Sequence, residues 1–296
     1  MRPGLAAKEN EPEPPMDVDE KLLPFPVRAE LRGLSKELSA IVAAHLVAAG
    51  ELIDDDPGLA YRHAEAARRR AARLPVVREA TAETAYAAGE YAVALKEYRA
   101  LRRMTGGDEY LPVMADCERA LGRPEQALRL AKEAAEASLD ADQQVEMLLV
   151  EAGAREDMGN SAEAFRLLKN GIGPKRGSKL AQARLRYAFA DLQERQGNTA
   201  AARQWFVSAG QLDDEQALDT TDRVNKLDGF VIEVGEDDDQ DFDDQDVVDE
   251  AQAEDETQPE DEAQPDESRP EDETNETDEV ELDDDHEDPE EQASER

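Results

Sequence analysis

The feature that most constrains the fold is a frame of small residues that recurs four times along the chain. Its reference points are four glycines spaced 33, 37 and 38 residues apart: Gly89, Gly122, Gly159 and Gly197. Each glycine has one alanine seven residues before it and another five residues after it, namely Ala82 and Ala94, Ala115 and Ala127, Ala152 and Ala164, and Ala190 and Ala202. The ninth residue after each glycine is Tyr98, Ala131, Leu168 or Phe206, and three of these are large and apolar. Such periodicity predicts an architecture of repeated units.

The segment from about Val27 to Leu227 is predicted to form one helix after another. Ala, Leu, Glu and Arg dominate it, and no sustained period-two alternation indicates a strand. The frame fits a helical hairpin, because small side chains let two helices cross closely and a glycine ends the first helix in the left-handed conformation. One hairpin cannot bury its apolar stripe alone, so we expect an all-α fold of stacked hairpins.

The frame resembles the tetratricopeptide repeat, a helix-turn-helix unit of roughly 34 residues. The resemblance rests on the paired alanines, the turn glycine and the bulky residue nine positions later. Tyr91 also matches an aromatic residue that the family often places two residues after the turn glycine. The family's tryptophan and its proline between repeats are mostly absent, and two units are three or four residues longer. The body also resembles uncharacterised actinobacterial tetratricopeptide-repeat proteins, a likeness that implies no established activity.

The resemblance implies an α-solenoid of four to five hairpins across residues 27–229. The expected repeats lie near residues 41–74, 75–107, 108–140, 145–176 and 183–212. The first is a degenerate unit, in which Ala48 and Ala60 keep the spacing of the paired alanines and Asp55 takes the place of glycine. Residues 213–229 are expected to form a final capping helix.

The N-terminal segment, residues 1–26, is rich in Pro and Glu and is predicted to be a disordered arm. Its apolar stretch "LLPFP", Leu22 to Pro26, leaves two alternatives open. It either docks on the helical body as an extended arm or remains a free leader.

In the tetratricopeptide family, the first helix of each hairpin lines a concave face that binds peptides. Transferring the positions of that face to this sequence gives thirteen candidate peptide-binding residues: Glu79, Glu83, Tyr86, Glu109, Asp116, Arg119, Glu146, Leu149, Glu156, Arg184, Tyr187, Asp191 and Glu194. Eight of them are acidic and two are arginines, which implies a groove that prefers a cationic ligand. The alternative is an ordinary solvated helix surface. The Lys/Asn clamp that some family members use for a C-terminal carboxylate is missing, so a chaperone-tail adaptor is not expected.

Acidic charge is concentrated at the C-terminal end. The chain carries a formal net charge of −39, and residues 236–296 contain 33 Asp and Glu against two Arg. Because like charges repel along such a segment, residues 230–296 are predicted to be a disordered acidic tail. Three roles remain open for this tail: a solubilising segment, a nucleic-acid mimic that masks basic proteins, or an autoinhibitory arm.

Patterns that carry catalysis or metal binding are not found. His45 and His63 lie on neighbouring predicted helices without companion ligands, so a structural role is favoured over a metal site. Cys117 is the sole cysteine, which excludes an internal disulfide, and we interpret it as a packing residue. The stretch "GIGPKRGSK" lacks the Gly-Lys-Ser/Thr order of a phosphate-binding loop. We therefore expect no enzyme activity, no metal and no cofactor.

Residues 62–73, "RHAEAARRRAAR", place five arginines on one predicted helix. Nucleic-acid binding is one interpretation of this arginine cluster. However, Glu65 interrupts the cluster, and long-range repulsion from the net charge of −39 opposes phosphate binding. We expect instead that the cluster receives the acidic tail of the same chain.

The sequence thus predicts a non-catalytic protein-interaction scaffold that binds a basic peptide or protein in a concave groove. The alternative is an acidic chaperone-like or regulatory factor for nucleic-acid-binding proteins that acts through its tail. A cytoplasmic location without membrane association is expected, since the N-terminus lacks a signal-peptide core and the most apolar run, "LSAIVAAHLVAAGELI", is short for a membrane span. No motif identifies the partner, the process or the oligomeric state.

Overall fold

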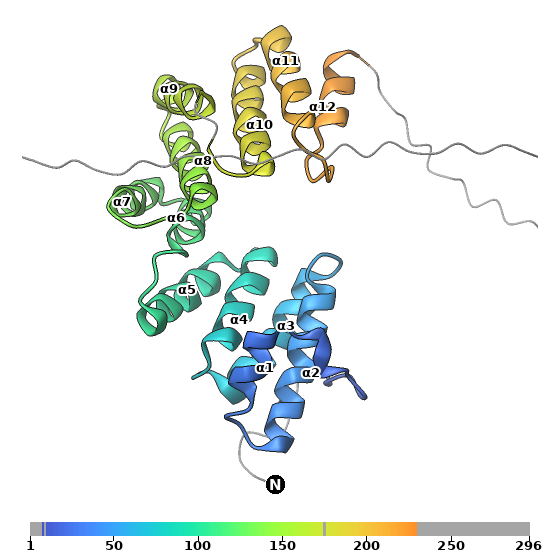
Figure 1. Ribbon diagram of the computed structural model, residues 1–296. Helices are drawn as coiled ribbons and strands as arrows, with labels where there is room; N and C mark the ends of the chain where they lie inside the picture. The colour runs from blue at the N-terminus through green and yellow to red at the C-terminus, as the bar shows by residue number, and fades with distance from the viewer. Residues whose placement is uncertain (1–7, 9, 174–175, 230–296) are drawn as a thin grey trace, which may run out of the picture. The chain divides into compact units, whose positions relative to one another are not determined.

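The computed structural model describes residue 8, residues 10–173 and residues 176–229. Within these ranges it contains twelve α-helices and no strand (Figure 1), which confirms the all-α prediction. The chain divides into two units, Met1–Gly235 and Glu236–Arg296. The predicted acidic tail, residues 230–296, lies outside the described residues.

Ten of the helices pair as five consecutive hairpins (Figure 1). The pairs are α2 (Lys36–Leu52) with α3 (Pro57–Ala71), α4 (Pro75–Ala87) with α5 (Tyr91–Thr105), α6 (Leu111–Ala120) with α7 (Pro124–Ala134), α8 (Ala141–Asp157) with α9 (Ser161–Ile172), and α10 (Lys179–Arg195) with α11 (Thr199–Gly210). A 3-10 turn, η1 (Glu20–Leu22), and the short helix α1 (Phe25–Leu31) precede them. Helix α12 (Thr220–Leu227) follows and packs on α11, as expected of a capping helix.

The hairpins pack on one another in chain order. The second helix of each hairpin contacts the first helix of the next, and the first helices α6, α8 and α10 also contact their neighbours directly. Helices α8 and α10 are 17 residues long, against 13 for α4 and 10 for α6. The two longer spacings in the frame therefore lie partly in longer first helices and not only in loops.

All four reference glycines adopt the backbone conformation that the frame predicts. Their φ angles are 75° at Gly89, 71° at Gly122, 77° at Gly159 and 82° at Gly197, in the left-handed region that L-residues disfavour. A Cβ atom built on any of them would meet nothing within 4 Å. Glycine is therefore required there by the turn and not by lack of space, which confirms the predicted helix ends.

The eight alanines of the frame are buried, each at most 3% exposed. In the hairpins with reference glycines Gly89 and Gly197, both alanines belong to one apolar cluster with the bulky residue that follows, Tyr98 and Phe206. The other two hairpins show the same arrangement around Ala131 and Leu168. Larger side chains at these contacts would overpack the core, so the small residues follow from the close approach of the helices.

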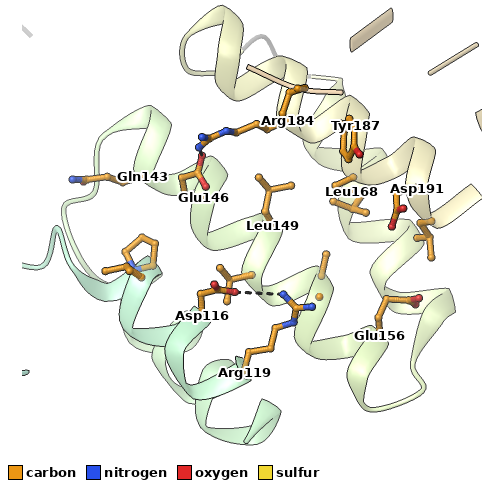
Figure 2. A pocket seen from close by; sticks show the side chains of 18 of the residues that line it. Asp116, Arg119, Gln143, Glu146, Leu149, Glu156, Leu168, Arg184, Tyr187 and Asp191 are labelled. Carbon is orange, nitrogen blue, oxygen red and sulfur yellow. Dashed lines mark hydrogen bonds and ion pairs between the residues drawn. The ribbon is translucent and has the colours of Figure 1, made fainter. Parts of the chain in front are cut away.

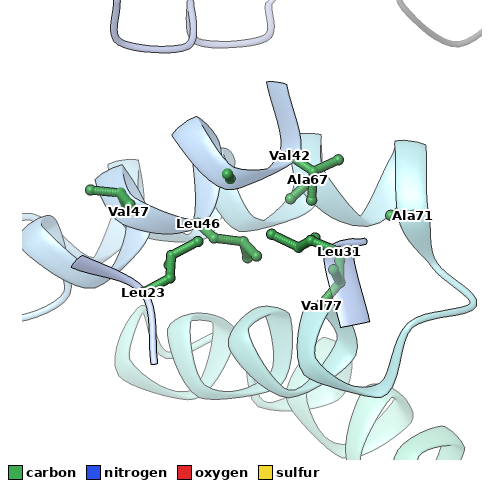
Figure 3. Packing of buried hydrophobic residues seen from close by; sticks show 9 residues of the cluster. Leu23, Leu31, Val42, Leu46, Val47, Ala67, Ala71 and Val77 are labelled. Carbon is green, nitrogen blue, oxygen red and sulfur yellow. The ribbon is translucent and has the colours of Figure 1, made fainter. Parts of the chain in front are cut away.

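The N-terminal segment differs from its prediction. Residues 10–24 lie against α2, α3 and α4. Leu23 is buried in an apolar cluster with Leu31, Leu46 and Val77 (Figure 3). The structure places residues 10–26 on the helical body, against the predicted disorder of residues 1–26. "LLPFP" docks through Leu23 alone and not as an extended arm, because η1 ends at Leu22 and α1 begins at Phe25, and both of these side chains are exposed. The composition of the segment does not predict this docking, because one or two buried side chains, of which Leu23 is one, are enough to hold a Pro-rich segment on the body. Residues 1–7 and 9 lie outside the described residues.

Candidate functional site

First helices of successive hairpins line an open groove of about 700 Å³ (Figure 2). Ten of the thirteen predicted peptide-binding residues lie on its wall: Tyr86, Glu109, Asp116, Arg119, Glu146, Leu149, Glu156, Arg184, Tyr187 and Asp191. Nine of them come from α4, α6, α8 and α10, and Glu109 lies in the turn just before α6. Positions that are more than a hundred residues apart in the sequence therefore converge on one surface.

Three predicted residues are not part of this groove. Glu194 lies on α10, where it pairs with Arg223 at 2.7 Å. Glu79 and Glu83 lie on α4 and line a separate pocket together with Leu23 and other residues of the N-terminal segment. The part of the predicted face that belongs to α4 is thus next to the chain's own N-terminal segment.

The groove combines an apolar floor with charged sides. Leu149 of α8 projects between Glu146 and Leu168 in Figure 2, and Pro112 and Val113 of α6 contribute further apolar surface. An apolar floor with a few polar side chains around it is the usual composition of a ligand-binding cleft.

Arg119 crosses the groove from α6 to α8. Its Nε atom donates to Asp157 Oδ2 at 2.7 Å. Its Nη1 atom lies 3.4 Å from Asp116 Oδ1, the contact that Figure 2 shows as a dashed line. The guanidinium lies on Gly153, where a Cβ atom would stand only 2.7 Å from Arg119 Cζ. Glycine at position 153 therefore lets the arginine lie flat against α8.

Two tyrosines donate hydrogen bonds across neighbouring elements. The Tyr86 hydroxyl donates to Asp116 Oδ2 at 2.5 Å, and the Tyr187 hydroxyl donates to Asp219 Oδ1 at 2.5 Å. Burial and the bonded carboxylate raise the pKa of Tyr86, and the same two causes raise the pKa of Tyr187 to about 12. Both phenols are therefore protonated donors at neutral pH.

Two arginines that the sequence analysis missed neutralise part of the acidic face. Arg195 pairs with Glu156 at 3.3 Å and with Asp191 at 3.1 Å. Arg223 of α12 bonds Asp191 at 2.8 Å, and its guanidinium lies 4.6 Å from the centre of the Phe206 ring. Arg195 is adjacent to a transferred position, so a one-residue wider window would have found it. Arg223 lies on α12, outside the repeats, so the spacing of the repeated residues could not indicate its contact with Asp191.

The groove wall therefore holds five carboxylates and three arginines, a smaller acidic excess than the predicted eight against two. Glu109 is exposed, and its side chain makes no ion pair or hydrogen bond within the part of the chain that the structure describes. Glu156 Oε1 is buried and accepts no hydrogen bond from described residues. Of these two carboxylates, the exposed Glu109 is the one that an external donor can reach.

The arginine cluster of residues 62–73 is largely engaged inside the protein. Arg68 pairs with Glu65 at 2.7 Å and lies 3.5 Å from the buried Glu97. Arg69 and Arg70 pair with Glu11 of the N-terminal segment. The expected contact of this cluster with the acidic tail lies outside the described residues.

The remaining candidates for chemistry are buried. His45 and His63 face each other with their Nδ1 atoms 3.0 Å apart, and no group of three or more metal-ligating side chains occurs within residues 8, 10–173 and 176–229. Cys117 is fully buried in the apolar cluster around Ala82 and Ala94, and burial raises the pKa of its thiol to about 12.

Comparison with models of known protein families gives no match for this chain. No curated protein matches it either. Among the helices that the structure describes, none is long and apolar enough to cross a membrane.

Proposed function

We propose that the chain is a tetratricopeptide-like α-solenoid that serves as a non-catalytic protein-interaction scaffold, with a basic peptide or protein bound in the groove of α6, α8 and α10. One observation carries the proposal. Ten predicted face positions from four separate hairpins meet in one groove, where carboxylates outnumber arginines five to three around an apolar floor.

The groove favours a peptide that combines a cationic side chain with an apolar one. A lysine or arginine fits beside Glu109, which has no competing partner among the described residues, and an apolar side chain fits over Leu149. The arginines that already pair with Asp116 and Asp191 limit the attraction, so complementarity contributes more to selectivity and association rate than to affinity.

The test is a selection of peptides from a random library on the full-length protein. Selected peptides are expected to carry a net positive charge and at least one apolar residue. Glu109→Lys is then expected to weaken their binding by at least about threefold, because it removes one attraction and adds one repulsion. Glu136→Lys is the matched control, since Glu136 is exposed, follows α7 and does not line the groove.

Both variants change the net charge equally and retain residues 236–296, so any general attraction to the acidic segment cancels. Enrichment of neutral or acidic peptides, or equal binding by the two variants, would refute the proposal.

The alternative function, an acidic chaperone-like or regulatory factor for nucleic-acid-binding proteins, rests on the 33 carboxylates of residues 236–296. Deleting these residues separates the two functions. A ligand held in the groove stays bound after the deletion, whereas a ligand held by the acidic segment is lost.

A further inference from the structure

A single glutamate of the N-terminal segment is buried between two arginines of α3. The Glu11 side chain is 5% exposed, and its Oε2 atom accepts hydrogen bonds from Arg69 Nε at 3.0 Å and Arg69 Nη2 at 2.7 Å. Its Oε1 atom pairs with Arg70, whose side chain is only 2% exposed. Burial alone would raise the pKa of Glu11, but the backbone amide of Lys8 and the two arginines lower that pKa overall.

Two histidines complete the surroundings of this carboxylate. His45 Nε2 lies 3.8 Å from Glu11 Oε1, and His45 Nδ1 lies 3.0 Å from His63 Nδ1. At 3.8 Å, His45 Nε2 and Glu11 Oε1 are too far apart for a hydrogen bond. The two Nδ1 atoms share one hydrogen bond, in which one ring donates and the other accepts. Burial and the neighbouring Arg70 lower the pKa of His45 to about 4, so its ring is neutral at pH 7.

This cluster is a built site and not a surface patch. His45 is fully buried, and its Nε2 atom and the buried Arg70 Nε atom have no hydrogen-bond partner among the described residues. A buried guanidinium is strongly destabilising unless a carboxylate or similar anion neutralises it. With residues 10–24 in place, Arg70 therefore needs an anion beside it, and Glu11 supplies it.

Apart from Glu11, the described residues of the segment make few contacts with the helical body. Arg62 Nη2 donates to the backbone carbonyl of Asn10 at 3.1 Å, and Leu23 packs into the apolar cluster further along. Beside Glu11, the segment and α3 leave a pocket of about 320 Å³ lined by Pro12 and Tyr61. Among the described residues, the contacts that hold residues 10–24 are the Glu11 ion pairs, the Asn10 carbonyl, Leu23 and the partly buried Val18, so this segment can open locally without unfolding the helices.

We propose that Arg69, Arg70 and His45 form a carboxylate-binding site for acidic peptides, which Glu11 fills within its own chain and from which an acidic peptide can displace it. Displacement releases residues 10–24 from α2, α3 and α4. Because Leu23 shares a pocket with Glu79 and Glu83, release also uncovers the part of the predicted peptide-binding face that belongs to α4.

The first test measures binding of a labelled peptide of residues 8–16 to the full-length protein by fluorescence anisotropy. Glu11→Gln removes the competing charge, and this variant is expected to bind the peptide at least about tenfold more tightly than the unchanged protein, the effect of one charge-assisted hydrogen bond. Glu13→Gln is the matched control, because Glu13 is exposed and changes the charge of the same segment equally. A peptide that itself carries Glu11→Gln is expected to lose binding.

Equal affinity for the Glu11→Gln and Glu13→Gln proteins, or for the charged and neutral peptides, would overturn the proposal. A second measurement needs no variant and so does not depend on the stability of Glu11→Gln. With the peptide in excess, backbone amides of residues 12–24 in the unchanged protein are expected to exchange hydrogen faster than without it. Unchanged exchange in these residues would also overturn the proposal.

Discussion

Replacing Gly122 by alanine tests the turn on which every repeated unit depends. Gly122 has a φ of 71°, and a Cβ atom there would meet nothing within 4 Å, so the substitution introduces no clash. Its cost is that of an L-residue in the left-handed region, about 1–2 kcal/mol. The loss of chain entropy in the unfolded state offsets about 0.4–1 kcal/mol of this. We expect a net loss of about 1 kcal/mol in the free energy of unfolding.

Gly50→Ala is the matched control for this substitution. Gly50 is also exposed and also has nothing within 4 Å of an added Cβ, but it lies inside α2 with an ordinary helical φ. Alanine there is expected to stabilise the protein by about 0.5–1 kcal/mol. Urea denaturation followed by circular dichroism at 222 nm measures both. If Gly122→Ala were neutral or stabilising, or shifted the midpoint in the same direction as Gly50→Ala, the assignment of the turn would be refuted.

Three further predictions concern the buried positions. Ala94→Leu is expected to destabilise the protein by about 1–3 kcal/mol through overpacking, whereas Ala92→Leu, on the exposed side of the same helix, is expected to change the unfolding free energy little. The pKa of His45 is about 4 in the folded protein, against an ordinary value of 6.5. The contribution of neutral His45 to the free energy of unfolding is therefore complete above pH 6.5, and about 3 kcal/mol of it is lost as the pH falls to 4. In urea denaturation across this range, the unfolding free energy of His45→Gln should depend less on pH than that of the unchanged protein. Cys117, fully buried with a thiol pKa raised to about 12, should react with a thiol reagent at pH 8 only at the rate of unfolding, and immediate reaction in native buffer would contradict its placement.

Local rules explain why much of the fold could be predicted from the sequence. Spacing alone places Ala82 and Ala94 at one helix crossing, because both the helical period and the turn between them are short-range properties. The left-handed conformation of Gly89 and its counterparts follows in the same way. The resemblance to the tetratricopeptide repeat also indicated ten of the groove residues, since equivalent positions on stacked hairpins must share a face.

Contacts between distant segments could not be predicted in the same way. Glu11 lies 58 residues before Arg69, and nothing in its Pro-rich surroundings indicates a buried ion pair. Arg223 reaches Asp191 from a helix outside the repeats. Counting acids on the transferred positions therefore overstated the charge of the groove, because the count could not include cations that other elements bring to it.

The most direct test of the groove as the binding surface is photo-crosslinking at a single position. A photoreactive amino acid replaces Leu149 on the groove floor, or Val207, which is 38% exposed on α11 and does not line the groove. Selected basic peptides are added to each full-length protein before irradiation. We predict a covalent adduct from position 149 and none from position 207. Equal adducts from both positions, or an adduct from position 207 alone, would contradict binding in the groove.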